Sequence, residues 1–387
     1  VDDWLCAMQV SKSHQVLSPC ESVSRAPSRW SLLGNGFRNP QRELVSTLLQ
    51  QLRSSIEKEI PLVIASGNLQ FNKNEEIDVV ISGGGLRGYY VTGAYVVLDQ
   101  LQRSIGLKVR RYAGASAGAW CAVFMCCGLH ELDWLETFYE SAAKAFGDHS
   151  ANCGGRGAKK MLDAYRLFLH TMVMPTLPPD AYRRCSGRVF LSISVLHCFH
   201  VKNIVISEFY SNADLLEACM ASSNIPFLAT SGAGHSFRGM RVLDGGLTNN
   251  LPCFHDDQRR QLVFDLSSVA YPVALTLSPE DSCIESLLLR GALELRQFAF
   301  RIGARGVDLE VGSKVPILWY DPKGPGSPSL GVSFLSTLQR LCRNLLVILV
   351  IFVLWRGGRS RLRVTMFKHA IGFKRKISET TALARPS

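Results

Sequence analysis

Two residues in this chain have types and settings that suit ester chemistry. Residues 114–118 read Gly-Ala-Ser-Ala-Gly, the G-x-S-x-G pattern that exposes a serine on a sharp turn between a strand and a helix. Residues 242–246 read Val-Leu-Asp-Gly-Gly, which places Asp244 at the end of a short apolar run. A serine hydroxyl needs a base to take its proton, so Ser116 and Asp244 are a candidate nucleophile and base. Taken alone, Asp-Gly is also ordinary turn chemistry, and the serine is also compatible with a plain helix start.

A glycine loop precedes the serine by about 30 residues. Residues 83–88 read Gly-Gly-Gly-Leu-Arg-Gly, and a glycine turn just before a helix points several backbone N–H groups at one spot. Such a spot suits a phosphate or an oxyanion. Read as G-x-G-x-x-G through Gly83, Gly85 and Gly88, the loop is alternatively a dinucleotide fingerprint. That reading requires an acidic residue about 20 positions later, and no Asp or Glu lies between residues 101 and 116.

The elements around these turns alternate between strands and helices. Residues 77–81 and 108–113 have the length and composition of buried strands, whereas residues 89–104 and 117–129 are predicted helices. Each glycine turn therefore joins a strand to a helix. This alternation predicts an α/β fold with a largely parallel sheet that is covered on both faces.

With all three segments in view, the sequence resembles the patatin-like phospholipase family. That family has a Gly-Gly-Gly-x-Arg/Lys-Gly oxyanion loop, a G-x-S-x-G nucleophile turn and an Asp-Gly-Gly/Ala segment. The motif glycines are matched by Gly83 and Gly88, by Gly114 and Gly118, and by Gly245 and Gly246.

The resemblance covers residues 77–265 and implies a three-layer sandwich with a mostly parallel central sheet. It further implies that Ser116 and Asp244 act as a dyad without histidine, with the backbone of Gly84, Gly85 and Leu86 as the oxyanion donors. Ser82 departs from the pattern, because many members have Asp just before the glycines.

Further matching runs are similar to the adiponutrin-type, neutral-lipid branch of the family. They lie at residues 185–196, 217–228 and 239–252. Both acylglycerols and phospholipids remain open as substrates.

A Ser-His-Asp triad is the alternative catalytic arrangement. The chain order Ser116, Asp244, His255 fits it, although no distinctive motif surrounds His255. His197 and His200 lie in an apolar stretch, where strand alternation would put them on opposite faces, so neither a metal site nor a cofactor is expected.

Length and composition fit one large domain with additions at both ends. The chain has 387 residues, of which 47% are hydrophobic. We expect a loose segment and a helix in residues 1–76, the catalytic domain at 77–265 and an extension at 266–387. The helix spans residues 40–60, with Leu44, Leu48, Leu52 and Ile56 at helical spacing.

Cysteine usage and the first residues favour an intracellular protein. The 12 cysteines include no C-x-x-C pair, and Cys121, Cys126 and Cys127 lie on a predicted apolar helix as reduced thiols. The first 30 residues contain no apolar core of the kind found in signal peptides.

The C-terminal region combines an apolar run with a basic tail. Residues 345–355 are uncharged, and eight Lys and Arg residues follow before Glu379, in a chain of net charge +11. The run is shorter than the ~20 residues of an ordinary spanning helix. Insertion into a lipid interface is the preferred interpretation, with a core element or a spanning anchor as alternatives. No nucleic-acid module accompanies the tail.

These features predict a lipid acyl hydrolase, associated with a membrane or a lipid droplet, that forms an acyl-enzyme on Ser116. Two other classes remain open. One is a membrane-surface protein that keeps the fold without catalysis, and the other is a nucleotide-binding α/β protein.

Overall fold

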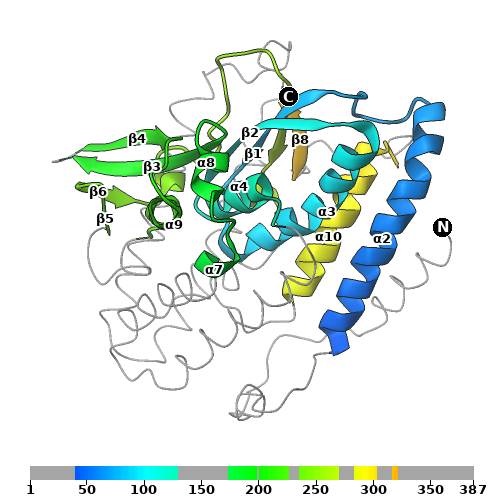
Figure 1. Ribbon diagram of the computed structural model, residues 1–387, viewed down its shortest axis with the longest axis horizontal. Helices are drawn as coiled ribbons and strands as arrows, with labels where there is room; N and C mark the ends of the chain where they lie inside the picture. The colour runs from blue at the N-terminus through cyan, green and yellow to red at the C-terminus, as the bar shows by residue number, and fades with distance from the viewer. Residues whose placement is uncertain are drawn as a thin grey trace, which may run out of the picture. The chain divides into compact units, whose positions relative to one another are not determined.

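The computed structural model describes residues 40–129, 173–197, 200–225, 235–269, 283–302 and 316–320. Its elements, in chain order (Figure 1), are α2 (Pro40–Ala65), β1 (Glu76–Ile81), the 3₁₀ turn η2 (Gly85–Arg87), α3 (Gly88–Ile105), β2 (Lys108–Ala115), α4 (Ala117–Cys127), α7 (Met174–Thr176), α8 (Ala181–Cys185), β3 (Val189–His197), β4 (His200–Ile206), α9 (Asn212–Ser222), β5 (His235–Phe237), β6 (Met240–Leu243), η4 (Gly245–Leu247), β7 (Gln261–Phe264), η5 (Leu266–Ser268), α10 (Cys283–Ala299) and β8 (Ile317–Tyr320). The expected loose segment at 1–39 and the apolar run at 345–355 lie outside the described residues.

The sheet is mixed and mostly parallel at its centre, as the alternation of elements predicts. Its order is β5-β6-β3-β2-β1-β7-β8, with β4 also paired to β3. The pairs β1–β2, β1–β7 and β2–β3 are parallel, whereas β4, β6 and β8 join antiparallel. The central strands are buried, which explains their apolar, β-branched composition. This architecture is that of a three-layer α/β fold.

Each face of the sheet packs against its own apolar cluster. Ile77, Val79 and Ile81 of β1 belong to the larger cluster, which also contains the buried faces of the helices. Val80 belongs to a smaller cluster on the opposite face, with Phe254 as its largest buried member. Strand alternation thus divides β1 between two packed layers.

Helices α2, α3 and α10 pack against one another beside the sheet (Figure 1). Glycine permits the close approach of α3 and α10, because a Cβ on Gly93 would lie 1.9 Å from the carbonyl oxygen of Leu288. Helix α2 is five residues longer than the predicted helix, and its buried stripe differs from the expected one. That stripe consists of Val45, Leu49, Leu52, Ile56 and Ile60. Leu44, expected in the stripe, is 58% exposed.

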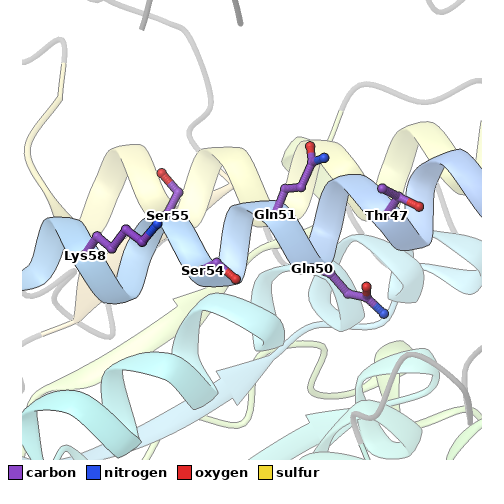
Figure 2. A pocket seen from close by; sticks show the side chains of 6 residues that line it. All are labelled: Thr47, Gln50, Gln51, Ser54, Ser55 and Lys58. Carbon is purple, nitrogen blue, oxygen red and sulfur yellow. The ribbon is translucent and has the colours of Figure 1, made fainter.

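The middle of α2 carries polar side chains that border a hollow of about 480 Å³. Figure 2 shows the side chains that line it, from Thr47, Gln50, Gln51, Ser54, Ser55 and Lys58. None of these residues belongs to the predicted site. Within the described parts of the chain, no helix has the length and apolarity needed to cross a bilayer.

The thiols that the structure describes are all free. Cys121 and Cys127 are buried on α4, as the apolar helix predicts, while Cys126 is partly exposed. Burial raises the pKa of the Cys121 thiol to about 12, so this cysteine is an inert core residue.

Candidate active site

The sheet topology brings Ser116 and Asp244 together. Strand β4 pairs with β3 across residues 191–197, so β2 and β6 both use the other edge of β3. On that edge Ala115 lies opposite Ser192, and Leu243 lies opposite Ser194. Since β2 runs parallel to β3 and β6 runs antiparallel, the two strands approach each other head-on. Ser116 and Asp244 are the residues that follow their facing ends.

Ser116 occupies a strained turn between β2 and α4. Its backbone angles are φ 53° and ψ −121°, outside the regions that most non-glycine residues adopt. Such a turn directs a serine side chain away from the sheet. The glycines on either side allow it, because a Cβ on Gly114 would lie 2.2 Å from the carbonyl oxygen of Gly118. A Cβ on Gly118 would lie 2.3 Å from the carbonyl oxygen of Ile81.

Asp244 is buried, at 8% exposure, and its Oδ1 accepts a hydrogen bond from the main-chain N–H of Gly246 at 2.8 Å. Burial raises the pKa of Asp244 to about 6, although the N–H of Gly246 and the nearby Ser116 side chain both act to lower it. A carboxylate with this pKa is a better proton acceptor at neutral pH than a solvent-exposed aspartate.

The main chain of the Asp244 turn is held from both sides. The N–H of Asp244 donates to the carbonyl of Asn224 at 2.7 Å, and its own carbonyl accepts from the Ser194 hydroxyl at 2.7 Å. Gly245 lies directly on β3, where a Cβ would meet the carbonyl oxygen of Ser192 at 1.9 Å. The turn is therefore fixed on β3 by backbone as well as side-chain contacts.

The glycine loop follows the end of β1 and lies against the serine. A Cβ built on Gly83 would be 2.9 Å from Cβ of Ser116. Gly85 has φ +59°, a conformation that favours glycine, and begins η2. The loop then passes into α3 at Gly88, so its N–H groups stand at the start of a helix. The N–H groups of Gly84, Gly85 and Leu86 remain the predicted oxyanion donors.

Ser82, the departure from the family pattern, is a structural anchor of this loop. It is fully buried, and its hydroxyl accepts a hydrogen bond from the N–H of Leu266 at 2.8 Å. The N–H of Ser82 donates to the carbonyl of Phe264 at 3.0 Å. The serine therefore ties the loop to the end of β7.

His255 lies at the other end of the sheet. Its Nδ1 is 3.2 Å from the hydroxyl of Tyr320, and Tyr320 pairs with Gln261 at the start of β7. Gln261 in turn lies opposite Asp78, near the first residue of β1, whereas the glycine loop follows the last. The structure therefore contradicts the triad Ser116, Asp244, His255.

His197 is the last residue of β3 and His200 the first of β4, and the two residues pair with each other. The expectation of opposite faces assumed one continuous strand, and that assumption is wrong. Among the residues that the structure describes, no cluster of His, Cys, Asp or Glu is arranged to hold a metal ion.

Two residues near the pair were not predicted to have a role. The Ser222 hydroxyl accepts a hydrogen bond from the N–H of Ser116, and Asn250 Oδ1 accepts one from the N–H of Gly83. Both lie in runs, 217–228 and 239–252, that resemble the family. That resemblance was the only sequence signal for them, because their partners are distant in the chain.

The region that contains these motifs is similar to known proteins. A family model described as patatin-like phospholipase matches residues 79–255. The human omega-hydroxyceramide transacylase is 32% identical over 179 residues, which are 45% of this chain and 31% of that protein. The human 1-acylglycerol-3-phosphate O-acyltransferase, of the adiponutrin type, is 30% identical over 171 residues, 44% of this chain and 34% of that protein. Human patatin-like phospholipase domain-containing protein 4 is 27% identical over 178 residues, 46% of this chain and 67% of that protein. The chain thus spans about a third of the length of the first two relatives.

Proposed function

Residues 79–255 are a patatin-like phospholipase domain, and from this premise we propose that the protein is a lipid acyl hydrolase that uses Ser116 and Asp244. The observation that carries the proposal is the head-on placement of Ser116 and the buried Asp244 along β3, beside the glycine loop, with the Ser116 side chain close enough to lower the pKa of the Asp244 carboxyl group. The relatives are named as phospholipase-domain proteins, acyltransferases and transacylases, which supports acyl chemistry on lipids.

The proposed reaction has two steps. In the first, Ser116 Oγ attacks the ester carbonyl while Asp244 takes its proton, and the N–H groups of Gly84, Gly85 and Leu86 hold the oxyanion. Collapse of this intermediate breaks the ester bond, and the leaving alcohol takes the proton from Asp244. An acyl-enzyme on Ser116 remains.

The second step depends on which acceptor enters. A water molecule that gives its proton to Asp244 attacks the acyl-enzyme, and its collapse releases a fatty acid and returns the proton to Ser116. A lipid hydroxyl in place of water would give acyl transfer, the reaction named for two of the relatives. Hydrolysis and transfer therefore share every group on the protein and differ only in the acceptor.

We further propose that the protein acts inside the cell at a membrane or droplet surface. An ester-cleaving site of this kind meets its substrate at an interface, and the apolar run at 345–355 with its basic flank suits insertion among headgroups.

The test is fatty-acid release by the purified protein from mixed phospholipid and triacylglycerol emulsions. Ser116→Ala and Asp244→Asn should abolish release, whereas His255→Ala should retain it because His255 lies at the opposite end of the sheet. Addition of an acylglycerol acceptor would reveal transfer as a new acylated product. Lipid binding without release above the Ser116→Ala background would favour a non-catalytic membrane protein. Nucleotide binding that is lost when the loop glycines are replaced by larger residues would favour the nucleotide-binding hypothesis.

A further inference from the structure

Asn250 contacts both the glycine loop and the turn of the aspartate. Its Oδ1 accepts a hydrogen bond from the N–H of Gly83 at 3.0 Å, between residues 167 positions apart. A Cβ on Gly83 would lie 2.8 Å from this oxygen, and a Cβ on Gly246 would lie 2.7 Å from it. One side-chain oxygen therefore lies against both segments.

The same two glycines lie against the proposed catalytic pair. The Cβ on Gly83 would also be 2.9 Å from Cβ of Ser116, and the Cβ on Gly246 would be 3.0 Å from Oδ1 of Asp244. Asn250 thus occupies the gap between the loop behind the nucleophile and the turn behind the base. A displacement of this side chain changes the spacing of both.

We propose that Asn250 is a positioning residue that sets the glycine loop relative to Ser116 and Asp244. The role rests on the proposed function, because its purpose is to aim the oxyanion donors. By accepting the N–H of Gly83, Asn250 removes that group from the donor set and leaves the next three N–H groups of the loop for the oxyanion. Oxyanion donors act only when they are aligned with the developing charge. A glycine loop that Asn250 no longer holds would therefore lower kcat and leave substrate binding unchanged.

The residue type at position 250 follows from its neighbours. An amide oxygen accepts the N–H of Gly83 without adding charge. A carboxylate of the same shape would accept the same bond, but it would place a second negative charge beside Asp244 and the oxyanion. Like charges raise the pKa of a carboxyl group, so an aspartate here would push the pKa of Asp244 above about 6.

Three variants test this role. Asn250→Ala removes the acceptor, Asn250→Asp keeps the acceptor and adds charge, and Asn249→Ala is the matched control. The contacts of Asn249 that the structure shows are made by main-chain atoms, its N–H to Gly245 and its carbonyl to the Ser192 hydroxyl, and alanine retains them. We expect Asn250→Ala to lower kcat about 10- to 100-fold with KM within about twofold, and Asn249→Ala to match the wild type.

The charge variant gives a readout that a structural role alone would not change. Asn250→Asp should move the midpoint of the pH–kcat/KM curve upward by about one unit or more and restore part of the alanine loss above that midpoint. Because it is isosteric, it also serves if the alanine protein does not fold. Wild-type kcat in Asn250→Ala, or an unmoved pH midpoint in Asn250→Asp, would overturn the proposal.

Hydrogen exchange separates this inference from the proposed function. The Gly83 amide should exchange faster in Asn250→Ala than in the wild type and Asn249→Ala, measured in a peptide that covers residues 83–88. If the wild type shows no Ser116-dependent fatty-acid release, the proposed function fails. Hydrogen exchange of the Gly83 amide then tests the role of Asn250 by itself. Faster exchange then supports the positioning of the loop by Asn250, and unchanged exchange overturns it.

Discussion

The Ser222 hydroxyl accepts a hydrogen bond from the main-chain N–H of Ser116 at 2.9 Å and donates one to the carbonyl of Ser192 at 2.7 Å. Ser222 is fully buried at the last position of α9, so a helix distant in the chain holds the strained turn of the serine. An unusual backbone conformation costs roughly 1–3 kcal/mol and persists only where its surroundings impose it.

Replacing Ser222 by alanine should loosen this turn. The change leaves the N–H of Ser116 and the carbonyl of Ser192 without this partner, so we expect the free energy of unfolding to fall by about 1–3 kcal/mol. Fatty-acid release should fall as well. Urea denaturation and turnover measure the two effects, with Ser54→Ala on the exposed face of α2 as the control. A Ser222→Ala protein with unchanged stability and unchanged turnover would contradict this account.

The activity should depend on pH through Asp244. A base must be ionised to accept a proton, and burial raises the pKa of Asp244 to about 6. We therefore expect kcat/KM to rise about tenfold per pH unit below 6 and to level off above about 7. A midpoint near 4, the ordinary value for an exposed aspartate, would show that burial does not govern the titration.

The same pKa predicts an unusual stability change for Asp244→Asn. Between pH 4 and 6 the folded protein holds a proton on Asp244 that the unfolded chain has released, so wild-type stability falls as pH rises through this window. The shift from 3.8 to about 6 corresponds to about 3 kcal/mol. Asparagine does not titrate, so the variant should gain about that much relative to the wild type between pH 4 and pH 7.5. If the free energies of unfolding of the wild type and the variant differ by the same amount at both pH values, the prediction is wrong.

Two glycines at opposite ends of α4 should respond differently to alanine. At Gly118 the new Cβ would lie 2.3 Å from the carbonyl oxygen of Ile81, so α4 must move away from β1. We expect a loss of about 3 kcal/mol or more, together with loss of activity. At Gly128 no atom lies within 4 Å, and only the left-handed backbone at φ +72° opposes alanine, at about 1 kcal/mol. Denaturation of both variants checks the contrast, and equal losses would argue against direct packing of α4 on β1.

Local periodicity is enough to predict the core elements from α2 to α4. The strands expected at 77–81 and 108–113 are β1 and β2, each within two residues. The buried face of α2 was less predictable, because Leu44 and Val45 are adjacent apolar residues that begin two different stripes. Packing on α3 and α10 selects the stripe of Val45, and no local pattern contains that information.

The site also contains residues that the sequence predicts and residues that it does not. Ser116 and Asp244 stand in glycine turns that are visible in the sequence, and the structure places them after the facing ends of β2 and β6. Ser222 and Asn250 act across 106 and 167 residues, through single hydrogen bonds to the backbone. A serine and an asparagine at a helix end and in a turn look ordinary until the sheet is assembled.

The head-on approach of β2 and β6 along β3 has a consequence for how the protein is made. Ser116 precedes Asp244 by 128 residues (244 − 116). At roughly 5–20 residues per second, the ribosome adds this stretch in roughly 6 to 26 s. During that interval the nascent chain has Ser116 and its glycine loop but lacks Asp244, its proposed base, which takes its place only when β6 docks on β3. The proposed catalytic pair is therefore completed late in synthesis, after the loop and the serine have been made.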